Sequence, residues 1–115
     1  MFKLIPNPMF DAPAAITVPG AQDLATLAVT WRHKGRKALA DWLRIGRGAT
    51  AEDGITDAAW LGEVIAGWAG PLDEAGAAVA YSPAALGALL DAYPPAGGEL
   101  RAVYLRALTE SRAKN

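Results

Sequence analysis

The spacing of hydrophobic residues changes from a period of two to a helical period near residue 34. Before that point, large apolar side chains alternate with small or polar ones over residues 27–32, as in a strand with one buried face. Residues 14–18 and 2–5 are shorter strand candidates, bounded by prolines and glycine. We therefore expect a small antiparallel sheet within about residues 2–33.

Beyond that point, apolar residues recur every three or four positions, which predicts about four amphipathic helices. The first covers about residues 35–46 and ends at Gly46 and Gly48 in the manner of a glycine C-cap. The second covers about residues 52–68, and its acidic first turn suits the positive end of a helix dipole. Its apolar stripe consists of Leu61, Val64, Ile65 and Trp68.

The third helix starts at Ser82-Pro83, where the serine is the predicted N-cap and the proline the first helical residue. It closes before Pro94-Pro95, and a fourth helix covers about residues 98–112. Residues 77–81, within the segment that precedes the third helix, fit either a short strand or a loop. The pattern therefore places the helices in the second part of the chain.

The chain has 115 residues, enough for one domain and too few for two separate cores. Hydrophobic residues make up 52% and charged residues 20%, which excludes a highly charged disordered chain. We expect a single α+β domain over residues 1–115. Its β-rich part, residues 2–33, packs with the helical part, residues 34–112.

Residue counts restrict the possible chemistry. Cysteine is absent and His33 is the single histidine, which excludes disulfides, thiolate metal sites and multi-histidine zinc sites. No residue pair offers a nucleophile with a positioned base, so we expect no enzymatic activity, no cofactor and no metal. No segment has the pattern of a membrane span or an export signal, and we expect an intracellular protein.

Charge is nearly balanced at a net of −1 but is unevenly distributed. Residues 32–47 carry a net of +5, whereas residues 48–100 hold eight acids and neither Lys nor Arg. The long acidic stretch would repel phosphate, which argues against nucleic acid as the partner. Opposite patches favour binding to a protein partner or to a second copy of the chain.

Two sets of side chains are candidates for partner binding. The first is a basic set on the face of the first predicted helix opposite Trp42: Arg36, Lys37, Arg44 and Arg47. An ordinary solvated helix face is the alternative interpretation of this set. The second set lies off the apolar stripes of its helices and consists of Trp60 and Leu105. Exposed aromatic residues are enriched in interface hot spots, and packing at the edge of the core is the alternative.

Several short segments, taken together and in their order along the chain, resemble those of a known protein family. They are residues 2–8 (FKLIPNP), 29–34 (VTWRHK), 65–68 (IAGW), 81–83 (YSP) and 89–94 (LLDAYP), followed by Tyr104-Leu105 and Lys114-Asn115. In this order they span essentially the whole chain. The set resembles a family of tail assembly chaperones of long-tailed bacteriophages and prophages.

The resemblance implies a non-enzymatic role in the cytoplasm of a bacterial host. Such chaperones bind the long, largely helical tape measure protein, keep it soluble until the tail tube polymerises around it, and are absent from the mature virion. The tail tube protein is a second partner that the resemblance implies, because longer frameshifted forms in several phages recruit it. The two oppositely charged segments lead us to expect a homo-oligomer. Because no segment has the pattern of a membrane span, we expect no membrane partner.

Two other functions are compatible with the sequence. One is a small structural protein of the virion, at the head–tail junction or in the tail. The other is a DNA-binding regulator that uses the basic segment at residues 31–47.

Overall fold

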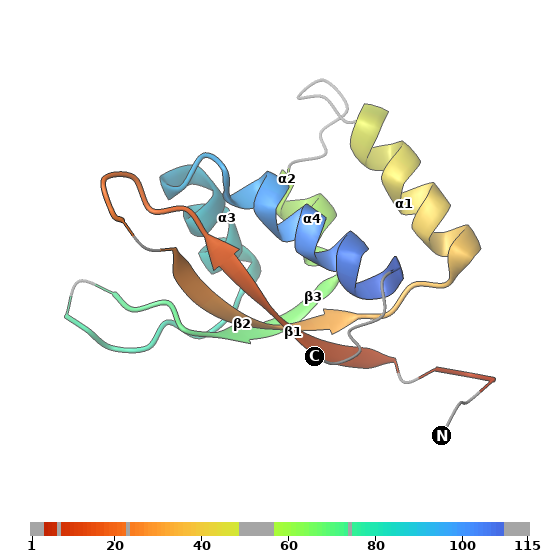
Figure 1. Ribbon diagram of the computed structural model, residues 1–115, viewed down its shortest axis with the longest axis horizontal. Helices are drawn as coiled ribbons and strands as arrows, with labels where there is room; N and C mark the ends of the chain where they lie inside the picture. The colour runs from red at the N-terminus through yellow and green to blue at the C-terminus, as the bar shows by residue number, and fades with distance from the viewer. Residues whose placement is uncertain (1–3, 7, 23, 49–56, 74, 110–115) are drawn as a thin grey trace.

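The computed structural model describes residues 4–6, 8–22, 24–48, 57–73 and 75–109, with the side chains of residues 47 and 48 left out. A three-stranded sheet carries the helices on one face, and none of the described helices or strands covers its other face (Figure 1). This arrangement confirms the predicted α+β class, with an antiparallel sheet followed by about four helices.

The sheet is an antiparallel meander of β1 (Met9–Ile16), β2 (Ala25–Arg32) and β3 (Ile65–Ala69), in that order. The register of the first hairpin pairs Met9 with Arg32 and Ile16 with Ala25. The predicted alternation over residues 27–32 is confirmed, because the inward side chains there are buried and the outward ones are small or polar. The strand predicted at residues 14–18 instead starts at Met9 and ends at Ile16, and its inward side chains from Ala12 onward are buried. The buried set comprises Ala12, Ala14, Ile16, Leu27, Val29 and Trp31.

The third strand does not come from the segment that the sequence predicted. Leu4 and Ile5 form a bend outside the sheet, and residues 2–3 lie outside the described part. The prediction of a helix through residue 68 is also wrong, because α2 (Asp57–Gly62) is short and β3 follows it. The apolar spacing of residues 61–68 fits both a buried helix and a short strand. Spacing alone therefore could not decide between them. The hydrogen-bonding edge of β2 decides in favour of the strand.

The remaining helices are α1 (Arg36–Gly48), α3 (Pro83–Ala92) and α4 (Ala96–Thr109). The predicted cap of α3 is confirmed, because the Ser82 hydroxyl accepts a hydrogen bond from the Ala85 amide at 3.0 Å. The predicted end of α4, residues 110–112, lies outside the described residues. Residues 77–81 are irregular except for an isolated antiparallel bridge between Ala78 and Leu72.

The helix end predicted at Gly46 needs correction, because α1 continues to Gly48. A Cβ atom at Gly46 would lie 2.2 Å from Cζ2 of Trp60. Gly46 therefore allows the Trp60 ring to approach α1 closely, and it is not the C-cap of the helix.

Aromatic side chains form the centre of the core, between the sheet and the helices. Trp31, Trp42 and Tyr104 are all at most 1% exposed. The Tyr104 hydroxyl donates to the carbonyl of Arg32 at 2.7 Å, and the Trp31 indole N–H donates to the carbonyl of Ala12 at 3.0 Å. These two buried polar groups thus have partners, and Tyr104 joins α4 to β2.

Candidate functional site

An apolar groove of about 430 Å³ opens at one end of the sheet. It lies between the turn of the first hairpin, the chain that follows β3, and α3. The side chains that build it are almost all apolar, among them Ile16, Leu27, Trp68, Leu72, Ala88 and Leu89. Leu72 is 65% exposed, a high value for a large apolar side chain. We call this feature the apolar groove.

Specific polar contacts hold the first wall of the apolar groove. Glu99, in the first turn of α4, accepts a hydrogen bond from the Thr17 amide at 3.0 Å and a second one from the Thr17 hydroxyl. Thr17 lies between Ile16 and Val18, both of which line the groove. The carboxylate therefore fixes the hairpin end relative to α4.

The opposite wall is held by a different set of contacts. The Trp68 indole N–H donates to the carbonyl of Val79 at 2.9 Å, and its ring meets Tyr81 edge-on with centroids 5.0 Å apart. Ser82 then caps α3, whose residues Ala85, Ala88 and Leu89 face the groove. Packing and capping therefore position this wall without the help of Glu99.

The charged residues next to the apolar groove are acidic. Asp73 directly follows Leu72, Asp91 lies on α3 and is exposed, and Glu99 binds Thr17 beside Val18. The segments that line the groove contain neither Lys nor Arg. An apolar ligand that carries positive charge at its margins would therefore find a complementary rim.

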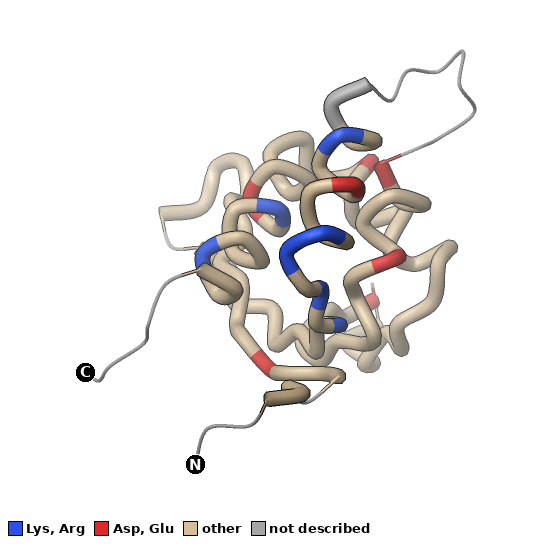
Figure 2. Tube along the Cα trace, turned by 90° about the vertical axis from the view of Figure 1, so that its right-hand side faces the viewer, with Lys and Arg blue, Asp and Glu red and all other residues tan. Residues whose placement is uncertain are grey.

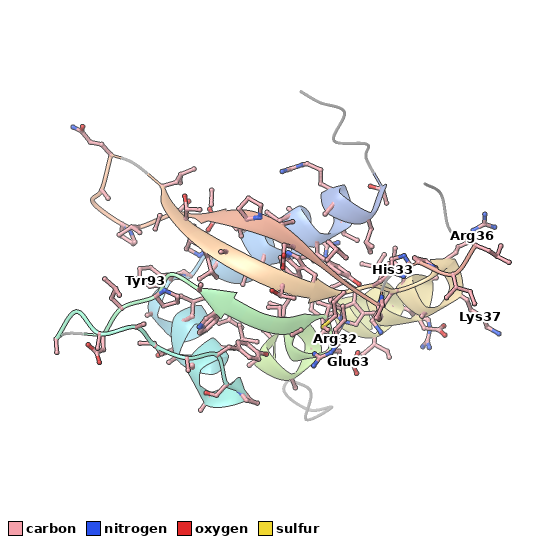
Figure 3. All side chains as sticks on the ribbon, turned by 90° about the horizontal axis from the view of Figure 1, so that it is seen from below. Arg32, His33, Arg36, Lys37, Glu63 and Tyr93 are labelled. Atoms are coloured by element: carbon pink, nitrogen blue, oxygen red, sulfur yellow. The ribbon has the colours of Figure 1, made fainter. Side chains whose placement is uncertain are left out.

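Basic residues lie on α1, at the other end of the molecule (Figure 2), and two more, Arg101 and Arg106, lie on α4. Arg36, Lys37 and Arg44 are exposed, and Arg44 lies 3.8 Å from Asp41 in an exposed ion pair. Figure 3 places Arg36 and Lys37 at one end and Tyr93, a groove residue, at the other. The side chain of Arg47 lies outside the described part. Partner binding by this set stays a prediction.

Trp60 packs against the core, which is the alternative role that the sequence analysis gave it. Its ring stacks on Trp42 with centroids 3.9 Å apart and an interplanar angle of 5°. Each indole N–H donates to the other residue's carbonyl, at 2.9 Å from Trp42 and 2.7 Å from Trp60. This reciprocal pair fastens α1 to α2.

Trp60 also lines a smaller pocket of about 200 Å³, together with Leu90, Pro94 and Arg101. Leu105 lies on α4, is half-buried, and lines neither this pocket nor the apolar groove. The structure therefore assigns the two predicted contact residues to different helices. Their part in partner binding remains a prediction.

Burial changes the acidity of two tyrosines. It raises the pKa of Tyr104 to about 12, and it raises the pKa of Tyr81 against the opposing effect of the Arg32 charge. Both phenols are therefore neutral at physiological pH. Across the described segments, no three His, Asp or Glu side chains converge as metal ligands, and no helix has both the length and the apolarity to cross a bilayer.

Sequence reasoning did not find the apolar groove. Its walls come from four separated segments, and Trp68 among them was interpreted as a core residue of a helix. The usable signal was Leu72, a large apolar residue in a stretch rich in turn-forming and acidic residues.

These features describe a small α+β domain with an exposed apolar groove and oppositely charged ends. The model of one protein family, described as phage tail assembly chaperone, matches residues 1–115, the whole chain. The chain therefore belongs to the phage tail assembly chaperone family, as the ordered motifs indicated. Neither a curated protein nor a solved structure matched the chain.

Proposed function

We propose that this chain binds the tape measure protein of a phage tail and keeps it soluble until the tail tube assembles. Family membership supports the assembly role. The observation that carries client binding is the apolar groove, because a concave apolar surface with a polar rim marks a site for an apolar ligand.

An amphipathic helix is the ligand best suited to this groove. Such a helix presents apolar side chains at i, i+3 or i+4, and i+7, and a groove between a helix and a sheet accepts them in a row. Burying each large apolar side chain contributes about 1.5–3 kcal/mol, and burying several in a row offsets the entropy lost on association. A long helical client offers many such stripes and would bind many copies.

In this proposal the protein binds its partners non-covalently and catalyses no reaction. It does so in the cytoplasm of the bacterial host. The tail tube protein is a further proposed partner, and absence from the finished particle is part of the proposal. The exposed cations Arg36, Lys37 and Arg44, with Arg47, are proposed to contact acidic surface, either on a partner or on another copy.

Co-expression with a helical fragment of a tape measure protein, followed by affinity capture, tests this function. Ala88 lines the groove from an exposed position on α3, so Ala88→Arg should obstruct the groove without disturbing the core. We expect capture to fall at least about tenfold.

Ala102→Arg is the matched control, because Ala102 is an exposed alanine on α4 that does not line the groove. It should capture the fragment like the original chain. Equal capture by the two variants would remove the groove as the client site. No capture by the original chain would contradict the function itself.

The other predicted contact residues need a separate experiment. Leu105→Gln should weaken capture if α4 contributes to the client surface. Trp60→Gln is a less specific test, because it also removes the ring that stacks on Trp42. Full capture by Leu105→Gln, with unchanged thermal stability, would exclude Leu105 as a contact.

The exposed cations of α1 are the observation that favours DNA binding as a second candidate. Phosphate contacts strengthen steeply as salt is lowered, so a mobility-shift assay with duplex DNA in about 50 mM salt is the sensitive test. We expect no shift, because the acidic groove end opposes binding to a polyanion. A salt-dependent shift would favour the regulator.

A further inference from the structure

We infer that residues 4–6 of one copy bind in the apolar groove of a second copy. We call these residues the N-terminal arm. Leu4 is 94% exposed and Ile5 is 80% exposed. Two adjacent large apolar side chains in open water are an unfavourable arrangement that a contact with another surface would remove.

The arm and the groove lie at opposite ends of the first strand (Figure 1). The arm precedes Met9, whereas the groove includes Ile16, seven residues further along β1. Seven steps of a strand span about 23 Å, while the five steps from Leu4 to Met9 reach at most about 18 Å. The arm therefore cannot reach the Ile16 end of its own groove, whereas the arm of a second copy can enter the groove at that end.

Charge favours the same head-to-tail arrangement. The arm leaves the molecule on the side of α1 (Figure 1), where Arg36 and Lys37 are exposed. At the other end, Asp73 and Asp91 are the sequence neighbours of the groove residues Leu72 and Ala92. Docking the arm of one copy into the groove of the next brings the two ends together with opposite signs. A symmetric pairing of two groove ends would place like charges against each other.

The backbone of the arm suits an apolar site. The residue before a proline is restricted to extended conformations, so Ile5 loses little freedom on docking ahead of Pro6. Pro6 also has no N–H group, which leaves one donor fewer to be buried without a partner.

The contact is heterologous: each copy donates one arm and accepts one arm, so copies add in a row. If the client binds where we propose, arm and client compete for the groove, and this competition alone rests on the proposed function. The contact between copies is measured without any client, so its failure would leave the proposed function standing.

Sedimentation velocity of the full chain tests the inference. We expect the original chain to self-associate at about 100 µM, and the double variant Leu4→Ser/Ile5→Ser to sediment as a monomer. Ala88→Arg should also be a monomer, because its groove is obstructed. Ala102→Arg should associate like the original chain, and matching circular dichroism spectra would show that all four fold alike.

An equal mixture of the two monomeric variants gives the sharpest result. The arm of the Ala88→Arg copy is intact, and so is the groove of the Leu4→Ser/Ile5→Ser copy. One such contact forms and no second one follows, so the mixture should contain dimers and nothing larger. A fluorescent peptide of residues 2–8 should bind the original chain and bind Ala88→Arg at least about tenfold more weakly.

Three results would overturn the inference. They are a monomeric original chain at about 100 µM, a mixture without dimers, and unchanged association of the Ala88→Arg variant. In the last case, loss of client capture by the same variant would assign the groove to the client alone.

Discussion

Gly46 occupies a position in α1 where the Trp60 ring leaves no room for a Cβ atom. A helical glycine normally gains about 0.5–1 kcal/mol when it becomes alanine. At Gly46 we expect the opposite, a loss of about 1–3 kcal/mol, because the stacked pair must separate. Urea denaturation measures the change.

Gly87→Ala is the matched control, because Gly87 lies within α3 and its Cβ would meet its nearest neighbour at 3.8 Å. This variant should be as stable as the original chain or slightly more so. Equal stability of the Gly46→Ala and Gly87→Ala variants would contradict the close approach of Trp60 to α1.

Tyr104 should make the protein sensitive to alkali. Its phenol titrates near pH 10 in the unfolded chain and near pH 12 in the folded one, because burial opposes ionisation. Between these values the unfolded state holds fewer protons, so stability falls as the pH rises. We expect a loss of order 2 kcal/mol by pH 12 in denaturation experiments.

Tyr104→Phe separates this effect from the other tyrosines. It removes the hydrogen bond to the Arg32 carbonyl, so stability at pH 7 should fall by about 1 kcal/mol or somewhat more. The decline above pH 10 should become shallower. An identical alkaline decline in both proteins would show that Tyr104 does not ionise on unfolding.

At the scale of elements, the capped start of α3 holds one wall of the apolar groove. Ser82→Ala removes the acceptor for the Ala85 amide and should destabilise the protein by about 1 kcal/mol. Ser82→Asp keeps an acceptor at the N-cap and should preserve stability. If both variants unfold at the same urea concentration, the cap does not contribute.

The elements that the sequence predicted well are those with strong local signals. Alternation at residues 27–32 identifies β2, and Ser82-Pro83 fixes the start of α3, because both signals act within a few residues. The third strand, β3, has no such local signal. Its apolar spacing fits a helix as well as a strand, and only the edge of β2, distant in sequence, determines the result.

Less of the candidate site than of the secondary structure could be predicted from the sequence. Exposed cations on α1 follow directly from helical spacing, and the structure places Arg36, Lys37 and Arg44 as expected. Gly46 and Trp60 carry no local sign that they approach each other. The apolar groove forms where separated segments end side by side, so no single segment contains its pattern.

At the scale of the whole molecule, opposite charge at the two ends should influence association. Arg36→Glu/Lys37→Glu reverses two exposed charges near the N-terminal arm and should weaken self-association about two- to fivefold at low salt. The difference should shrink at about 0.5 M salt, because screening then acts over a few ångströms. Sedimentation at both salt concentrations measures it.

Arg101→Glu/Arg106→Glu on α4 reverses two exposed charges elsewhere and serves as the control, because it changes the net charge by the same amount. Equal weakening by both changes would mean that net charge alone, and not its position, governs association.

The carboxylate of Glu99 fastens the hairpin side of the groove to α4, while Trp68, Tyr81 and the Ser82 cap support the α3 side. Because the two walls of the groove are anchored independently, they can separate slightly while the hydrogen bonds that hold each wall stay intact. A groove of this kind selects for hydrophobic side chains but not for one side-chain shape. We therefore expect it to accept leucine, isoleucine, methionine and phenylalanine alike. Under the proposed function, this tolerance would let one groove bind successive segments of a long client that differ in sequence.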